Sequence, residues 1–164
     1  MDKDLEAHKL TELSKAEMVS LSKLKISEWQ EIKGGSFLES LEAWREGPSS
    51  HVFGLCFLLQ NRPVGMTLFK RPPLSPSWAS SNAATIHGLK ISQPFQGRGL
   101  GHRAFNLAVQ HMKEHWHETS TLMLAVDADN VAAIAVYRAF GMVDSGPIYE
   151  GRNGLENRFS ISIK

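Results

Sequence analysis

The residues best suited to chemistry lie in the segment QPFQGRGLG, residues 93–101, in which Gly97, Gly99 and Gly101 alternate with other residues. Glycine inside a regular element costs roughly 0.5–1 kcal/mol relative to alanine, so this spacing indicates a turn whose backbone must stay uncovered. A strand-like segment precedes the glycines and a helix-like segment follows them, which places their amides at a helix N-terminus. Such amides have no intrahelical partner and attract phosphate oxygens. We therefore expect a phosphate-binding loop, with a ligand-free strand-to-helix turn as the alternative.

Two common phosphate-binding motifs do not fit this loop. No Lys-Ser or Lys-Thr pair follows the glycines, which excludes the P-loop pattern. The spacing is G-x-G-x-G rather than G-x-G-x-x-G, and SQPF separates the strand from the glycines, so the dinucleotide fingerprint fits poorly. Asp127, after the next strand, could act as a ribose-binding acid, and this keeps a dinucleotide as a minor alternative.

The loop and a second segment together resemble the GCN5-related N-acetyltransferases, or GNAT family. The acetyl-CoA loop of that family reads Q/R-x-x-G-x-G/A, and its second signature is a strand, then Asn near the start of a helix, then Tyr and Gly at its end. The matching residues are Gln96, Gly99 and Gly101 in the loop and Asn130, Tyr137 and Gly141 in LMLAVDADNVAAIAVYRAFGM. The specific match spans about residues 84–163. It departs from the family at Met142, where an aromatic residue is usual, and at His87-Gly88, where relatives often carry acids.

The resemblance implies an α/β (α+β) fold with a mixed, mostly antiparallel sheet flanked by helices and one parallel βαβ unit. It implies a single N-acetyltransferase domain over residues 1–164 that uses acetyl-CoA as co-substrate and transfers the acetyl group directly in a ternary complex. The residues that it assigns to cofactor binding are Leu89, Ile91, Gln96, Gly97, Arg98, Gly99, Leu100, Gly101, His102 and Asn130.

Acetyl transfer from a thioester to an amine makes three chemical demands. The amine must be neutral, although a free alkyl amine has a pKa near 10, so a group must accept its proton. The developing oxyanion needs N–H donors, and the resemblance assigns the backbone amides of Leu89 and Ile91 to it. The departing thiolate needs a proton donor, and the resemblance assigns Tyr137, two helical turns after Asn130. A packing role for Tyr137 is the alternative.

The proton acceptor is the least defined of these groups. His87 has an ordinary pKa near 6.5 and lies on the strand before the loop, so it is the candidate, although strand alternation could turn it away from the cleft. Glu28, Glu31 and Glu39 could approach a cationic amine, but a solvated helix face explains them equally well.

Periodicity and turn residues predict the elements that would position these side chains. The expected elements, in chain order, are a helix capped by Ser14 and Glu17 with Met18, Leu21 and Leu24 as its apolar stripe, a helix from Ser36 to Gly47, strands 51–59 and 64–70, a loop over 71–83, a strand at 84–91, a helix over 99–116, a strand at 121–126, a helix from Asn130 to Gly141, and a final hairpin turning at Asn153-Gly154 with Leu155, Phe159, Ile161 and Ile163 on one face. The strand, helix and strand between residues 84 and 126 form a βαβ unit with parallel strands.

Two further groups of residues invite a chemical interpretation. His111, His115 and His117 have metal-ligand spacing, but no HExxH pattern accompanies them and histidine suits a helix C-terminus, so no metal is expected. Cys56 lies in an apolar strand and is expected to be a buried core residue.

Composition limits the class of protein. The chain has 164 residues, 21% of them charged, a net charge of +1 and one cysteine. We therefore expect no nucleic-acid or membrane partner and a reducing, cytoplasmic location. The N-terminal segment is charged, without an apolar run of signal-peptide length. The expected acceptor is a small amine such as a polyamine, an amino acid or an aminated metabolite. A protein N-terminus or lysine, and a non-catalytic acyl-CoA-binding or sensing domain, are the alternatives. The sequence leaves the oligomeric state open, although members of the family that it resembles are often homodimers.

Overall fold

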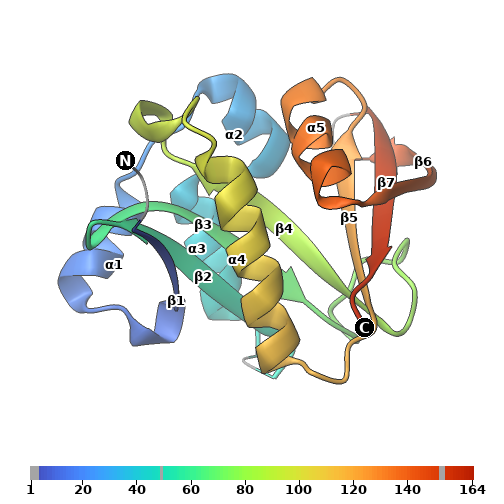
Figure 1. Cartoon of the computed structure of the whole chain (residues 1–164), viewed down its shortest axis with the longest axis horizontal. Coiled ribbons are helices and arrows are strands. Elements are labelled where there is room, and N and C mark those ends of the chain that lie inside the picture. Colours follow the sequence, from blue (N-terminus) through green and yellow to red (C-terminus); the bar gives the residue numbers. More distant parts are fainter. Residues whose placement is uncertain (1–3, 49, 152–153) are drawn as a thin grey trace.

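The computed structural model describes residues 4–48, 50–151 and 154–164. It contains a seven-stranded sheet in the order β1-β2-β3-β4-β5-β7-β6, with helices on both faces (Figure 1). The elements are β1 (Leu5–Lys9), η1 (Leu10–Glu12), α1 (Lys15–Ser22), α2 (Glu28–Gly34), α3 (Phe37–Glu46), β2 (Val52–Leu59), β3 (Arg62–Lys70), β4 (Ala83–Ile91), η2 (Gln93–Phe95), α4 (Leu100–His115), β5 (Thr121–Asp127), α5 (Val131–Phe140), β6 (Val143–Gly151) and β7 (Gly154–Ser162).

Side-chain caps define where the early helices begin. Ser14 accepts a hydrogen bond from the Glu17 amide at 3.1 Å, and the Glu17 carboxylate accepts one from the Ser14 amide at 2.8 Å, which is the predicted capping box. Ser27 and Gln30 form a second capping box at the start of α2. The sequence analysis predicted neither α2 nor β1, because both are short and lack a clear apolar period.

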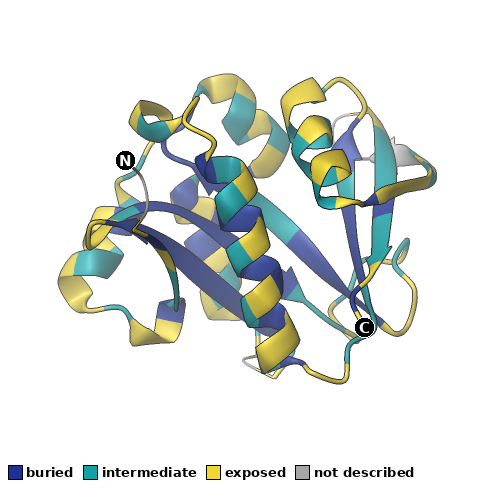
Figure 2. Ribbon diagram, viewed as in Figure 1, coloured by how far each residue is buried: buried dark blue, intermediate teal, exposed yellow. Residues whose placement is uncertain are grey.

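The sheet separates two apolar layers. Helix α4 covers one face, where Phe105 and Met112 meet the inner side chains of the strands. Helices α1 and α3 cover the other face, where Leu21 and Phe37 pack against β2 and β3. Strand β2 is buried along its whole length because both layers cover it (Figure 2).

The pairing between β4 and β5 positions the functional site. All other neighbouring strands are antiparallel, whereas β4 and β5 are parallel and pair only from Ala83 with Thr121 to Thr85 with Met123. This confirms the predicted mixed sheet with one parallel βαβ unit. Within the described residues the two strands are not paired beyond this point, which leaves one edge of β4 without a neighbouring strand there.

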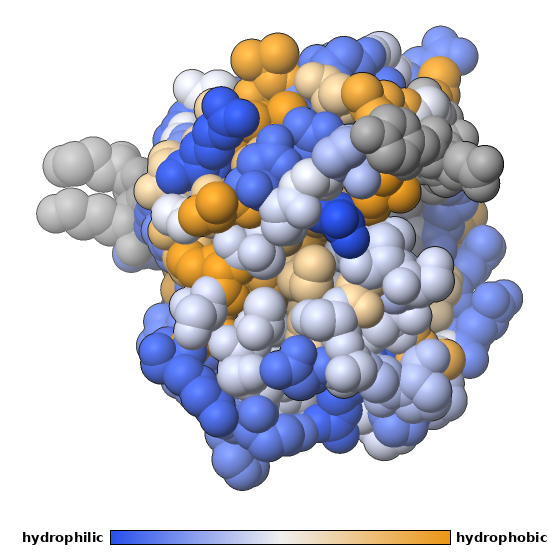
Figure 3. All heavy atoms as spheres, turned by 90° about the vertical axis from the view of Figure 1, so that its right-hand side faces the viewer, coloured by the Kyte–Doolittle hydropathy of each residue, from blue (hydrophilic) through white to orange (hydrophobic). Residues whose placement is uncertain are grey.

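The chain ends in the predicted antiparallel hairpin of β6 and β7. Phe159 and Ile163 are buried, but Leu155 is 49% exposed, so the apolar face does not extend to the start of β7. The predicted turn residue Asn153 lies outside the described residues. Figure 3 shows this side of the molecule, where apolar side chains are interspersed with hydrophilic ones. Within the described residues, no helix combines the length and the apolar character needed to cross a bilayer.

Candidate functional site

A cavity of about 520 Å³ opens where β4 and β5 lose their pairing. Its walls come from the end of β4, the end of β5, the glycine loop, α2 and α5. Its lining includes Trp29, Lys33, Gly88, Leu89, Lys90, Ile91, Gln96, Asp127, Asn130 and Tyr137. The cavity therefore joins segments that lie up to 130 positions apart, from Ile26 to Glu156.

The glycine loop presents its backbone to this cavity. Gly97 and Gly99 have φ angles of +77° and +75°, in the left-handed region that favours glycine. Gly99 is the N-cap residue of α4 and offers no side-chain cap, so the first amides of this 16-residue helix lack a capping partner. A Cβ atom at Gly97, Gly99 or Gly101 would meet no protein atom within 4 Å, which leaves open space above the loop. These features suit the phosphate groups of a ligand.

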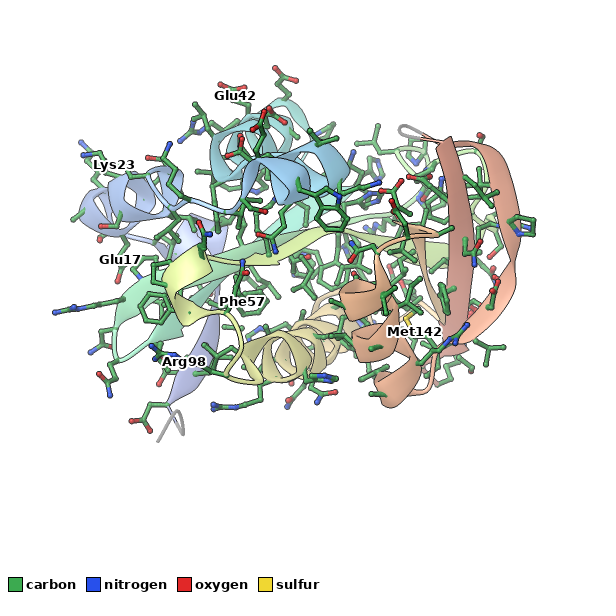
Figure 4. The ribbon with its side chains drawn as sticks, turned by 90° about the horizontal axis from the view of Figure 1, so that it is seen from above. Glu17, Lys23, Glu42, Phe57, Arg98 and Met142 are labelled. Carbon is green, nitrogen blue, oxygen red and sulfur yellow. The ribbon has the colours of Figure 1, made fainter. Side chains whose placement is uncertain are left out.

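Gln96 ties the loop to the strands and to α2. Its Nε2 donates to the Ile91 carbonyl at 2.8 Å, and its side-chain amide pairs with that of Gln30 at 3.1 and 3.3 Å. Figure 4 shows Arg98 on the outer side of the same loop, where its guanidinium lies over the Phe95 ring. Of the ten residues predicted to bind cofactor, Arg98 alone is outside the cavity lining of the described residues.

Helix α5 brings Asn130 and Tyr137 to the same wall. The Asn130 side chain accepts a hydrogen bond from the Ala133 amide at 3.3 Å and so caps the helix. The Tyr137 ring packs 5.4 Å from the Phe105 ring and 6.5 Å from the Phe159 ring, measured between centroids. Burial raises the pKa of Tyr137 to about 12. Its hydroxyl therefore stays protonated at neutral pH and can donate a hydrogen bond or a proton.

His87, the predicted proton acceptor, is not among the residues that line the cavity. Its Nε2 lies 2.7 Å from the Thr85 hydroxyl. Burial, and secondarily Lys70, lowers the pKa of His87 to about 4. Glu28, Glu31 and Glu39 are also absent from the lining. The structure thus brings neither His87, the candidate base, nor the three glutamates that could approach a cationic amine to the cavity wall, and a catalytic role for His87 stays a prediction.

An ion pair that the sequence analysis missed crosses the cavity from α2 to β5. Lys33 Nζ lies 3.0 Å from a carboxylate oxygen of Asp129 and 3.6 Å from Asp127 Oδ1, and it approaches the Trp29 ring centroid to 5.5 Å. The hydrogen bond to Asp129 is the main cause that raises the pKa of Lys33. Asp127 is only 5% exposed, and its Oδ1 accepts no hydrogen bond in the described part of the chain.

Lys90 is a second cavity residue that the sequence analysis missed. It is 7% exposed, its Nζ lies 2.5 Å from Ser40 Oγ, and the Phe37 ring centroid is 5.7 Å away. Burial lowers the pKa of Lys90 to about 8, against a smaller opposing effect of Glu39. Strict strand alternation would have placed Lys90 on the other face, so no sequence signal indicated it.

Comparison with known proteins places this geometry in a family. The sequence model of the Acetyltransferase (GNAT) family matches residues 18–142, which include the whole cavity except Glu156. The chain belongs to the GNAT family. This confirms the resemblance and, at the level of the family, the expectation of an N-acetyltransferase that uses acetyl-CoA.

Individual relatives agree with this assignment. A mycothiol acetyltransferase from Corynebacterium glutamicum (strain R) is 34% identical over 67 residues, which are 40% of this chain; the chain spans only 22% of that relative. The structure of the aminoglycoside acetyltransferase AAC(6')-Ib with coenzyme A covers 97% of this chain and 95% of its own, at a TM-score of 0.73 and 13% identity. The spermidine N-acetyltransferase from Vibrio cholerae with CoA and spermine covers 96% and 95%, at a TM-score of 0.72 and 16% identity. At such identities the structural likeness concerns the fold.

The remaining candidates lie outside the cavity. No three metal-ligating side chains converge within the described residues. The His115 ring packs 4.4 Å from the Phe53 ring, and burial lowers the pKa of His115. Cys56 is buried in β2, where burial raises the pKa of its thiol to about 12, so it resembles a core residue rather than a nucleophile.

Proposed function

We propose that the protein is an N-acetyltransferase that transfers the acetyl group of acetyl-CoA to a primary amine of a small molecule, by direct attack in a ternary complex. One observation carries the proposal: a single cavity joins an uncapped, side-chain-free glycine loop at one end to Tyr137 and a set of buried charges at the other.

The residues present fit acetyl-CoA. The open space above Gly97, Gly99 and Gly101 accommodates phosphate groups against the N-terminus of α4. The unpaired edge of β4 offers backbone groups at Leu89 and Ile91 to an extended arm. Asn130 and Tyr137 face this edge from α5. Acetyl-CoA supplies an activated thioester, and the protein has to orient it and manage the protons.

Named roles follow for the residues of the chain. The Leu89 amide would donate to the thioester oxygen as negative charge develops there, and the Ile91 amide would hold the arm. The protonated Tyr137 hydroxyl would donate to the departing sulfur, and its high pKa guarantees the proton at neutral pH. The packed rings of Phe105 and Phe159 keep the phenol in place.

The acceptor end of the cavity favours a cationic amine. Asp127 and Glu156 line it, and the Asp127 carboxylate is buried without a hydrogen bond to Oδ1. Lys33 approaches Asp127 Oδ1 only to 3.6 Å, which is beyond hydrogen-bond distance, so this buried oxygen keeps an acceptor position that an ammonium group of the substrate would fill. Two of the named relatives carry the names of an aminoglycoside and of spermidine, which are small amines. A protein N-terminus or a lysine side chain is the second candidate acceptor.

Calorimetric titration with acetyl-CoA, with NAD in parallel, tests the cofactor. Saturable binding of acetyl-CoA alone supports the proposal, whereas binding of NAD alone would overturn it. CoA release is then followed with spermidine, paromomycin and a peptide with an N-terminal serine. CoA release with the peptide alone would contradict the small-molecule acceptor.

The variant Tyr137→Phe separates an enzyme from a non-catalytic acyl-CoA-binding domain. It keeps the ring and its packing but removes the hydroxyl. We expect turnover to fall by about 10²- to 10⁴-fold, with acetyl-CoA affinity unchanged. Undiminished turnover would refute the proton-donor role. Binding of acetyl-CoA without transfer to any amine would favour the non-catalytic domain.

A further inference from the structure

The site described so far lacks a group that removes the proton from the acceptor ammonium. His87 does not line the cavity, and one of the two lining carboxylates, Asp127, faces the Lys33 ammonium at 3.6 Å. Ala125, which also lines the cavity on the same face of β5 as Asp127, has no group that could accept a proton. Apart from Tyr137, the other titratable side chains in the lining are His102 of α4, Glu156 of β7 and Lys90 of β4, and of these Lys90 is on the same strand as Leu89 and Ile91.

A β-bulge brings Lys90 to this place. His87 and Lys90 of β4 are three residues apart, but their partners in β3, Leu68 and Met66, are only two residues apart. The extra residue in β4 reverses the alternation. Ile86 and Ile91 consequently both reach the core under α4, although strict alternation would put them on opposite faces. Lys90 therefore points toward α2 and α3.

Gly88 in this bulge makes room for the amine. Its φ is +61°, and a Cβ atom there would lie 3.0 Å from Lys90 Nζ, 3.4 Å from Ser40 Oγ and 3.4 Å from the Gly34 carbonyl oxygen. The Lys90 nitrogen thus folds back over the residue that directly precedes Leu89. Leu89 is the residue whose amide we assign to the thioester oxygen, so the Lys90 nitrogen lies over the residue next to that proposed amide donor.

The surroundings of Lys90 suit a neutral amine. Within the described part of the chain no carboxylate lies within ion-pair distance of it. Its nitrogen contacts a serine hydroxyl and an aromatic ring. The charged groups that face it are Glu39 of α3 and, along the same cavity, Lys33 of α2, Asp127 of β5 and Glu156 of β7. The β3 residues from Met66 to Leu68 bring no charge. A buried lysine without a paired carboxylate loses its proton easily, which agrees with the lowered pKa of about 8.

We propose that the amine of Lys90 is the base that accepts the proton of the acceptor ammonium, with Ser40 holding it in place. This inference rests on the proposed acetyl transfer. The ammonium N–H bond breaks and the proton moves to Lys90 Nζ; the freed lone pair forms the C–N bond as the C–S bond breaks. The sulfur takes the Tyr137 proton, Tyr137 recovers a proton from the nitrogen that becomes the amide, and Lys90 returns its own to water. One ammonium and one thioester thus give an amide, a thiol and one proton.

Competitive labelling tests the state of Lys90 without any acceptor. The protein is treated with trace acetic anhydride from pH 6 to pH 11, and the acetylated peptides are quantified by mass spectrometry, with the exposed Lys113 as internal reference. We expect the Lys90 labelling to rise with a midpoint near pH 8. A midpoint at the ordinary lysine value of 10.5 would overturn the proposal.

Paired variants test its role in turnover. The amine with the highest rate in the panel above serves as acceptor, and kcat/KM is measured against pH. For Lys90→Met and Lys90→Arg we expect at least a 100-fold loss at pH 8, disappearance of the acid limb near pH 8, and acetyl-CoA affinity within threefold of wild type. Arginine stays protonated, so it cannot replace a base, but it would replace a lysine that only binds an anionic group. Full activity of Lys90→Arg, or an unchanged limb near pH 8 in either variant, would overturn the assignment.

A stability measurement separates this role from a structural one. The pKa of Lys90 is lower in the folded protein than the ordinary value of 10.5, so the unfolded chain takes up the proton first as the pH falls. The free energy of unfolding therefore decreases between about pH 10.5 and pH 8 and stays constant at the lower value below pH 8. Lys90→Met should therefore have a higher Tm than wild type at pH 7, by a few degrees, and the gain should vanish toward pH 10.5. A lower Tm at pH 7 would show that Lys90 serves the fold. A wild-type protein that binds acetyl-CoA but acetylates no amine would overturn the proposed function itself, and this inference with it.

Discussion

The glycine loop permits a test in which two neighbouring glycines should respond in opposite directions. Gly99 has a φ of +75°, whereas Gly101 is not among the positive-φ glycines and lies in the first turn of α4. A Cβ atom would meet no protein atom within 4 Å at either position, so the backbone conformation alone distinguishes them. An alanine in the left-handed region costs about 1–2 kcal/mol, and an alanine in place of a helical glycine gains about 0.5–1 kcal/mol.

These free energies predict measurable changes. For a domain of this size, 1 kcal/mol shifts Tm by about 2–4 °C. Gly99→Ala should lower Tm by about 2–8 °C, and Gly101→Ala should raise it by about 1–4 °C. Gly99→Ala should also weaken acetyl-CoA binding at least tenfold, because the left-handed conformation of Gly99 sets the direction in which the N–H groups of the loop point. Gly101→Ala should bind within threefold of wild type, since the family motif accepts alanine there.

Thermal unfolding followed by circular dichroism, with calorimetric titration of acetyl-CoA, measures both effects on both variants. The matched control is built in, because each variant adds one methyl group two positions from the other. Equal Tm values for the two variants, or wild-type acetyl-CoA affinity in Gly99→Ala, would refute the reasoning that the left-handed backbone at Gly99 shapes the phosphate site.

Two further predictions concern charges. Asp127→Asn should raise the KM for a cationic acceptor at least tenfold, with little change in the KM for acetyl-CoA. Asp129→Asn, at a carboxylate that is 68% exposed, should change the KM for the acceptor less than threefold. Steady-state kinetics with spermidine measures both variants, and equal effects would show that the cation does not bind at Asp127. The pKa of His87 is lowered from 6.5 to about 4, so its contribution to stability is present above pH 6.5 and is lost as the pH falls toward 4. The free energy of unfolding should fall by about 3 kcal/mol at most, and solvent screening of the partly buried ring makes the decrease smaller. In urea unfolding at pH 7 and pH 4.5, His87→Gln, which keeps a donor near Thr85, should lose less stability than wild type; an identical loss would assign the acid sensitivity to another group.

Local signals in the sequence were enough to predict several parts of this protein. The capping box of Ser14 and Glu17, the N-cap at Asn130 and the left-handed Gly141 at the end of α5 depend on residues within one helical turn of one another. The glycine loop is likewise local, because its conformation follows from the glycines themselves and from the helix that starts after Gly99. The mixed sheet followed from the family resemblance and from the order of the strands.

Tertiary structure decided which side chains meet at the cavity. Lys33 lies 94 positions before Asp127, and Ser40 lies 50 positions before Lys90, so no periodicity could have paired them. The bulge at Gly88 was decisive, because one extra residue in β4 reversed the faces of everything after it and moved Lys90 to the cavity wall, while His87 was left bonded to Thr85 outside it. Sequence alternation holds only while two strands stay in register, and register is set by the partner strand rather than by the segment itself. The type of each residue was therefore visible in the sequence, but which side chain of β4 reaches the cavity wall depended on how β3 and β4 pair.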